Sequence, residues 1–473
     1  MTHSTDPAGT VSDGSTARWT DRKRYLWLVA LVMPCLPFAA VGLYSMTGWG
    51  VWLWLGPIVI LGLVPVIDMI VGLDGSNPPD NLIAALEKDR YYRWITYLFL
   101  PIQYAGFVTA FWFIARGELT TIEKVGLAVT VGFIGGLGIN TAHELGHKRE
   151  TVERWLSKIA LAQTFYGHFY IEHNRGHHVR VATPADPASS RLGESFYRFW
   201  PRTVFGSLAN AWRIERRRYA VRHRHPLRPG NDVLNAWLMS VVLWVVMIAW
   251  LGVGILPYLV IQALIGLTLL EAVNYLEHYG MLRRIVGAPG SKRYERVDPS
   301  HSWNSNNIAT NVLLYHLQRH SDHHANPTRR YQALRDYEES PALPTGYAAM
   351  ILLALVPVAW RRVMDRRVAD HFDGDLMRAN MTPRRRARLA LSEARPALVL
   401  PDADEEAPAA LDSSTVRGGR CPGCGYTYDE AVGDAREGFP PGTPWSAVLD
   451  TWCCPDCGVR DKLDFIPIVK ASA

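Results

Sequence analysis

Residues 125–148 have the sequence VGLAVTVGFIGGLGINTAHELGHK, an apolar run that ends in two histidines four positions apart. The part before His143 carries no charge and is expected to form a short membrane span. We expect the helix to continue beyond the end of that span. The step from His143 to His147 places both imidazoles on one face of a helix, aimed at a shared point. The stretch therefore predicts a membrane helix whose end presents a pair of metal ligands.

Other apolar runs of spanning length accompany this one. The run 25–67 has no charged residue and is long enough for two helices of about 20 residues with a turn near Thr47. The charge-free run between Asp232 and Glu271 supplies two more, broken near Gly254. We expect six transmembrane helices in all, within residues 25–67 (two), 94–115, 125–142 and 232–271 (two). Residues 347–360 are apolar but short, and we expect an interfacial or packed helix there.

Basic residues beside the span ends predict the orientation. The clusters at 22–24, 88–93 and 148–149 all fall on one side of the expected bundle, which the positive-inside tendency makes cytoplasmic. Both termini then face the cytoplasm in a bacterial-type inner (plasma) membrane. The net charge of +6 lies in short clusters that flank apolar runs, so it indicates contact with the lipid bilayer and no nucleic-acid partner.

Histidines are grouped, and fourteen of the sixteen lie between His143 and His324. Nine of them form groups with steps of three to five residues or follow a span, and all fall on the expected cytoplasmic side: His143, His147, His173, His177, His178, His278, His320, His323 and His324. One metal rarely needs more than three to five protein ligands, so nine imidazoles predict two metals. Iron is favoured for activating O2, because zinc cannot change its oxidation state.

Some histidines and carboxylates stay outside this ligand set. Five histidines are not predicted to be ligands: His168, His223, His225, His301 and His316. Of these, His168 and His316 could contact the ligand histidines without binding the metals. Three carboxylates could orient ligand imidazoles through hydrogen bonds, or make ordinary helix-end contacts instead: Glu144, Asp186 and Glu277.

A zinc protease is a specific alternative, because the string from His143 to His147 also matches the H-E-x-x-H pattern. Glu144 would then be a general base acting on zinc-bound water. The other clustered histidines would have no role at a single zinc site, and this disfavours the protease.

Cysteines gather near the C-terminus, where five of the six fall between Cys421 and Cys457. Two C-x-x-C pairs, each followed by Gly, supply four thiolates for one tetrahedral metal site: Cys421, Cys424, Cys454 and Cys457. This spacing indicates a metal site in place of a disulfide framework, but it does not by itself exclude a zinc ribbon.

The residues between the two cysteine pairs resemble rubredoxin. The resemblance covers residues 421–468 and includes Tyr426, the run Pro440-Pro-Gly-Thr-Pro-Trp445 and Trp452. It implies that the four cysteines hold one iron, which carries one electron at a time, and that Cys453 is not a ligand. Tyr426, Trp445 and Phe465 would pack around that iron and limit water access.

The histidine strings resemble those of the membrane alkane 1-monooxygenases, the rubredoxin-dependent branch of the histidine-box desaturases and hydroxylases. They are HELGHK at 143–148, EHNRGHH at 172–178, NYLEHYG at 274–280 and LQRHSDHH at 317–324. The resemblance implies two histidine-bound non-heme irons that insert one oxygen atom of O2 into the terminal methyl of an n-alkane. Electrons would come from NAD(P)H through a rubredoxin reductase.

Together these features predict an α-helical integral membrane protein, with six transmembrane helices and a cytoplasmic helical cap, joined to a small four-cysteine iron domain. Its parts would be a disordered N-terminus at 1–20, the membrane di-iron domain at 21–375, a flexible linker at 376–420 and the rubredoxin domain at 421–468. Rival functions are a fatty-acyl desaturase or other lipid hydroxylase, and a histidine-rich metal transporter with a zinc-ribbon sensor. Chain-length preference would depend on whether Trp49, Trp52 or Trp54 blocks the channel.

Overall fold

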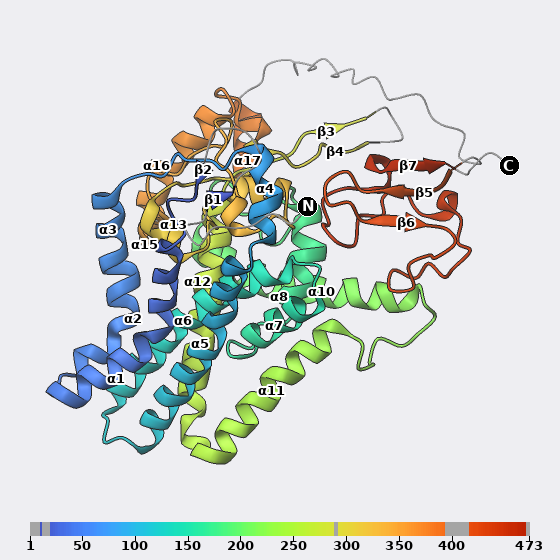
Figure 1. Ribbon diagram of the computed structural model, residues 1–473. Coiled ribbons are helices and arrows are strands. Elements are labelled where there is room, and N and C mark those ends of the chain that lie inside the picture. Colours follow the sequence, from blue (N-terminus) through green and yellow to red (C-terminus); the bar gives the residue numbers. More distant parts are fainter. Residues whose placement is uncertain (1–9, 12–18, 288–291, 393–415, 470–473) are drawn as a thin grey trace.

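The computed structural model describes residues 10–11, 19–287, 292–392 and 416–469. Long helices form a bundle, and a small β-domain drawn in red lies beside one end of it (Figure 1). Most of the predicted disordered N-terminus lies outside the described residues. Within it, β1 (Thr10–Val11) pairs antiparallel with β2 (Trp19–Thr20).

The prediction of six membrane spans is confirmed. In the described part of the chain, six helices are long and apolar enough to cross a membrane. The third, fourth and fifth spans are α5 (Arg90–Arg116), α6 (Thr121–Gly146) and α11 (Asp232–Leu251). The others are composite: η1 (Leu26–Cys35) with α1 (Leu36–Thr47); η2 (Gly50–Trp54), α2 (Leu55–Pro57), η3 (Ile58–Leu63) and α3 (Val64–Val71); η5 (Val253–Ile255) with α12 (Leu256–Glu277).

Helix α6 lies at the centre of the bundle because glycines let α12 approach it closely. A Cβ atom added at Gly132 would lie 2.7 Å from Cβ of Ile265 and 2.8 Å from the carbonyl oxygen of Gln262. Small residues at such contacts are the usual means by which membrane helices pack. At the other end of α6, Thr120 and Glu123 form a reciprocal capping box that fixes where the helix begins. The two helices that carry His143, His147 and His278 are thus held side by side.

Helices that are not candidate membrane spans gather at the end of the bundle where α6 and α12 finish (Figure 1). They come from between the spans and after the sixth span: α4 (Asp80–Lys88), α7 (Thr151–Ala162), α8 (Phe169–Glu172), η4 (His173–His177), α9 (His178–Arg180), α10 (Phe196–Ala220), η6 (Pro299–His301), α13 (Ile308–Leu313), α14 (His320–Ala325) and η7 (Tyr331–Ala333). A two-stranded ladder, β3 (Ile285–Val286) with β4 (Arg293–Tyr294), follows α12.

The apolar segment 347–360 is not one helix. It comprises α15 (Tyr347–Ala354) and the beginning of α16 (Pro357–His371), which are bent by 120° at the break. Pro357 starts the second helix, because proline is accommodated at the first position of a helix but not inside one. Tyr347 and Met350 are buried among side chains of α12, so α15 packs against the bundle.

The stretch 376–420, expected to be a flexible linker, begins with ordered structure. It contains η8 (Leu376–Arg378) and α17 (Pro383–Ser392), with Ala379 and Met381 buried and Met381 bridged to Leu192. Residues 393–415 of that stretch lie outside the described residues.

The C-terminal domain is built on a three-stranded antiparallel sheet in the order β6 (Thr427–Asp429), β5 (Val416–Arg420), β7 (Ile466–Val469). Short turns η10 (Trp445–Ala447) and η11 (Lys462–Asp464) complete it. Its core packs Tyr426, Trp445 and Phe465 around the cysteines. This burial leaves little room for water near the sulfur atoms.

Candidate metal centres and apolar cavity

The nine predicted histidines converge into two groups of ring nitrogens, and each group could hold one metal ion. The first contains His143, His147, His173, His178 and His323, and the second contains His177, His278, His320 and His324. Within each group the ligand atoms lie within 4.8 Å of one another, and all nine side chains are buried. The sequence predicted the set of nine but not this division.

A π-helical turn explains the division at the second motif. The backbone N–H of His178 donates to the carbonyl of His173, five residues earlier, because η4 is a π-helix. The turn brings His173 and His178 into the same group and sends His177 to the other. In a regular α-helix a four-residue step would instead place His173 and His177 on one face. Such π-helical turns are frequent at functional sites.

The ring nitrogens suit a metal ion better than they suit one another. Nε2 of His178 lies 3.0 Å from Nε2 of His173 and 3.2 Å from Nε2 of His323, and Nε2 of His324 lies 2.8 Å from Nε2 of His320. Two ligands about 2.0–2.1 Å from one ion would be separated by roughly 3 Å to 3.5 Å. Nε2 of His143, His147 and His177 is buried and has no hydrogen-bond partner among the residues that the structure describes. Unpaired buried nitrogens are costly unless a cation binds them.

Burial also keeps the imidazoles in the form that binds metals. It lowers the pKa well below the ordinary value for seven of them: His147, His173, His178, His278, His320, His323 and His324. Neutral imidazole is the ligand form. The two groups are therefore consistent with a di-iron site.

The three predicted carboxylates have different partners. Asp186 accepts a hydrogen bond of 2.9 Å from Nδ1 of His177, and Oε2 of Glu277 lies 3.2 Å from Nε2 of His320. Glu144 forms an ion pair of 3.0 Å with Nζ of Lys148 and accepts a hydrogen bond from the backbone N–H of Tyr331. These partners are a lysine and a backbone amide, and neither is an imidazole.

The histidines that were not predicted to be ligands lie outside both groups. His316 contacts Nζ of Lys23 at 3.0 Å and the carbonyl of Tyr331 at 2.9 Å, which links the N-terminal segment to the helices after the sixth span. His301 pairs with Glu295. His223 and His225 are exposed, and His168 is buried beside the ring of Tyr166.

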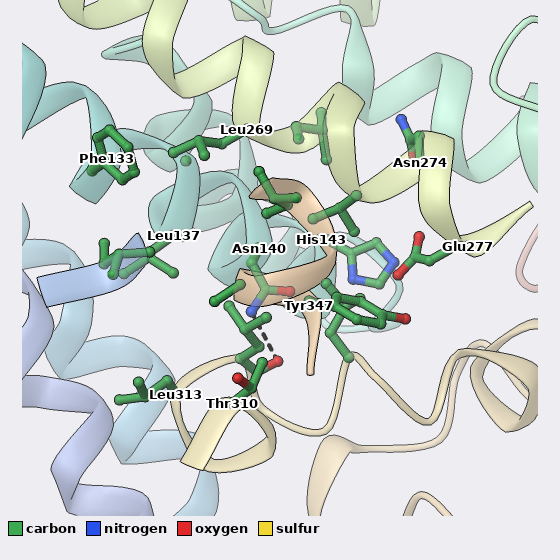
Figure 2. Close-up of a pocket in the computed structure, with 18 of the residues that line it drawn as sticks. Phe133, Leu137, Asn140, His143, Leu269, Asn274, Glu277, Thr310, Leu313 and Tyr347 are labelled. Carbon is green, nitrogen blue, oxygen red and sulfur yellow. Dashed lines mark hydrogen bonds between the residues drawn. The ribbon is translucent and has the colours of Figure 1, made fainter. Parts of the chain in front are cut away.

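An apolar cavity leads to the metal centres. Its far part is lined by Met33, Ile60 and Phe133, and its near part reaches His143, His173 and His320, which belong to both groups. Figure 2 shows Phe133 and Leu137 at one end of the cavity and His143, Glu277 and Tyr347 at the other. Most polar side chains along it are engaged elsewhere; Asn140, for example, donates to the carbonyl of Leu314 at 2.9 Å.

The four cysteines of the C-terminal domain converge as predicted. Their sulfur atoms lie within 4.8 Å of one another, and Cys421, Cys454 and Cys457 are buried. The domain rests against the helices that carry the histidines. A Cβ atom added at Gly458, next to Cys457, would lie 2.7 Å from the carbonyl oxygen of Asn174 and 3.6 Å from Cβ of His178. The two kinds of metal site thus approach each other through a backbone contact, which the sequence did not predict.

Comparison with known proteins gives the class. Residues 123–354 match the fatty acid desaturase family, and residues 419–465 match rubredoxin. Rubredoxin 3 of Rhodococcus erythropolis is 71% identical over 49 residues, which are 10% of this chain and 80% of that protein. The fold and the two kinds of site therefore define a histidine-rich membrane oxidoreductase that carries its own rubredoxin domain, and its four cysteines form a rubredoxin-type iron site.

Longer matches give the family. Alkane 1-monooxygenase 1 of Alcanivorax borkumensis is 44% identical over 372 residues, 79% of this chain and 91% of that protein. Alkane 1-monooxygenase of Acinetobacter baylyi is 46% identical over 385 residues, 80% of this chain and 93% of that protein. The chain belongs to the alkane 1-monooxygenase family.

Proposed function

We propose that the chain hydroxylates the terminal methyl of medium-to-long-chain n-alkanes, with electrons passed from NAD(P)H through a rubredoxin reductase to its own rubredoxin domain. The observation that carries this proposal is the apolar cavity that ends at ligands of both histidine groups. One alkane, one O2, two electrons and two protons give one 1-alkanol and one water. The four-cysteine iron carries one electron, so it is reduced twice per turnover.

Two histidine-bound irons would supply the reductive activation of O2. The protein's part is to hold an apolar chain with its end at the metals and to exclude water. Among the described residues that line the cavity none is Lys or Arg, so a substrate carboxylate would find no counter-charge there. This favours an alkane over a free fatty acid.

We further propose that Asp186 acts through His177 and that Glu277 acts on the metal side of His320. Asp186 is buried and also accepts from Oγ of Ser189 at 2.6 Å. Burial alone would raise the pKa of Asp186, but its contacts with His177 lower it to about 2. A carboxylate on Nδ1 fixes the imidazole so that Nε2 faces the metal. Glu277 has a different place: its Oε2 lies 3.2 Å from Nε2 of His320, the nitrogen that also faces Nε2 of His324 at 2.8 Å, so Glu277 would lie on the metal side of that ring and at the substrate end of the cavity.

Asp186→Asn is expected to weaken metal binding and hydroxylation by about 10-fold to 100-fold. The amide keeps the size of the side chain but no longer holds His177 in one tautomer and orientation. Iron retained after graded chelation of the purified protein measures the effect. Asp298→Asn, which removes the carboxylate beside the non-ligand His301, serves as the matched control. Equal iron retention in both variants would contradict the role of Asp186.

Cavity length is expected to set the chain-length range. Leu137 lines the cavity one and a half turns before His143 on α6, and an indole there would shorten the space available. Leu137→Trp should lower kcat/KM about 10-fold or more for the longest alkanes accepted, with little change for the shortest. Competition between two alkanes in one reaction measures this ratio. A uniform loss for all lengths would instead indicate general damage to the fold.

We place the metal centres and both termini on the cytoplasmic side of the inner membrane, because basic residues cluster at that end of the spans. The function is tested by supplying the purified, iron-loaded protein with NADH, a rubredoxin reductase and a medium-chain alkane. The proposal expects the terminal alcohol. A terminal alkene, or oxygen uptake without product from any alkane, would overturn it.

A further inference from the structure

In most of the ion pairs that join the two domains, the membrane domain carries the positive charge and the rubredoxin domain carries the negative charge. Arginines on the membrane domain meet carboxylates on the rubredoxin domain in six pairs: Arg149 with Asp456 (3.2 Å), Arg154 with Asp456 (3.3 Å), Arg175 with Glu437 (2.8 Å), Arg293 with Asp461 (3.3 Å), Arg293 with Asp464 (3.7 Å) and Arg296 with Asp464. One pair runs the other way, from Arg436 to Asp232 at 3.0 Å. The membrane domain therefore presents a positive face, called here the arginine face, to an acidic partner surface.

Part of the arginine face lies against the iron-binding loops. Asp456 is inside the Cys454-Pro-Asp-Cys457 loop, so Arg149 and Arg154 are brought next to the four thiolates. Both guanidinium groups therefore lie beside a loop whose sulfur atoms carry negative charge.

That charge depends on the oxidation state. Four thiolates around a ferric ion leave one net negative charge, and around a ferrous ion they leave two. Cations within a few ångströms attract the ferrous site, with its two negative charges, more strongly than the ferric site. The difference is largest where water is partly excluded. By reciprocity, whatever makes the reduced domain bind more tightly also makes the bound domain easier to reduce.

We propose that the arginine face binds the rubredoxin domain more tightly when its iron is reduced than when it is oxidised. The inference rests on the proposed function, in which this iron gives its electron to the histidine-bound irons. The reduced domain docks with Gly458 against Asn174 and His178, and passing on the electron weakens the attraction. The oxidised domain then leaves the arginine face and exposes its iron loops to the reductase. Because the charge of the iron site changes with its oxidation state, the domain binds when it is reduced and leaves when it is oxidised.

The test is a spectroelectrochemical titration of the four-cysteine iron in the intact, iron-loaded protein in detergent. Its reduction potential should fall by about 59 mV or more between about 20 mM and about 500 mM salt, because screening releases the domain. This shift corresponds to a tenfold preference of the arginine face for the reduced form. Salt acting only on the anionic site would stabilise the reduced form and raise the potential, which is the opposite sign.

In low salt, the four-cysteine iron of Arg149→Gln should have a lower reduction potential than that of the unchanged protein. Its reduction potential should also change less when salt is added. Arg362→Gln, on an exposed position of α16, removes the same charge away from the ion pairs and should behave like the unchanged protein. If Arg149→Gln folds poorly, Arg154→Gln tests the same contact. Equal potentials for the unchanged protein and both arginine-face variants would overturn the proposal. The potentials do not depend on hydroxylation, so failure to form an alcohol would count against the proposed function alone.

Discussion

Replacing His173 by Ala is expected to abolish alkane hydroxylation while the cysteine-bound iron remains reducible. His173 contributes a nitrogen to the five-histidine group and lines the cavity, and its ring stacks on Phe169 with centroids 4.7 Å apart. Removing a residue that hydrogen-bonds to a metal ligand lowers activity by roughly 10-fold to 100-fold. Removing the ligand itself should lower turnover by more than this. The measurements are alcohol formation and the visible spectrum of the rubredoxin iron on the same sample.

His223→Ala is the control for this substitution, because His223 is exposed and outside both histidine groups. It should leave turnover unchanged. Hydroxylation that persists in His173→Ala at the level of the control would contradict the assignment of the metal centre. Loss of the rubredoxin spectrum as well would indicate misfolding, and a second ligand variant such as His324→Ala would then carry the test.

The second large effect is expected from one methyl group at the domain contact. Gly458 and Gly425 follow the second cysteine of each pair and have similar left-handed backbones, with φ of +69° and +74°. A Cβ at Gly458 would clash with the backbone of Asn174, whereas one at Gly425 would have its nearest contact at 3.6 Å, with the side chain of Arg420. Gly458→Ala must therefore push the domains apart, and Gly425→Ala need not.

Stopped-flow reoxidation of the cysteine-bound iron by O2 and alkane measures the consequence. Gly458→Ala should slow electron transfer to the histidine-bound irons by about 10-fold to 100-fold, because an overpacked contact costs about 1–3 kcal/mol and each 1.4 kcal/mol lowers the docked population about tenfold. Gly425→Ala carries the same backbone strain and should keep its rate. Equal slowing in both variants would mean that strain within the rubredoxin domain, and not the contact with Asn174, is responsible.

Local sequence patterns predicted the parts of this protein that depend on short-range rules. Charge-free runs predicted six spans, and a four-residue step predicted that His143 and His147 face one point; both lie in the five-histidine group. A four-residue step does not have this result at His173, because the π-helical turn places His178 in the group of His173 and His177 in the other. Whether a turn is α-helical or π-helical depends on how the ring nitrogens pack in three dimensions, and the spacing of the motif does not record it.

Contacts between distant segments were beyond local patterns. The channel was expected to depend on tryptophans at 49, 52 or 54, yet the described residues that line the cavity include Phe133 and Leu137 of α6 and Tyr347 of α15. Likewise Arg149 and Asp456 are separated by about three hundred positions, and each looks like an ordinary surface charge when taken alone. Only the tertiary fold brings such residues together.

We infer that one chain holds both a cysteine-bound electron donor and a histidine-bound iron pair. Mössbauer spectroscopy of the purified protein loaded with ⁵⁷Fe, combined with metal analysis, can test this inference. We expect iron in two environments, one part with tetrahedral sulfur ligands and two parts with nitrogen ligands. Zinc in the histidine groups, or iron in the cysteine site alone, would contradict it.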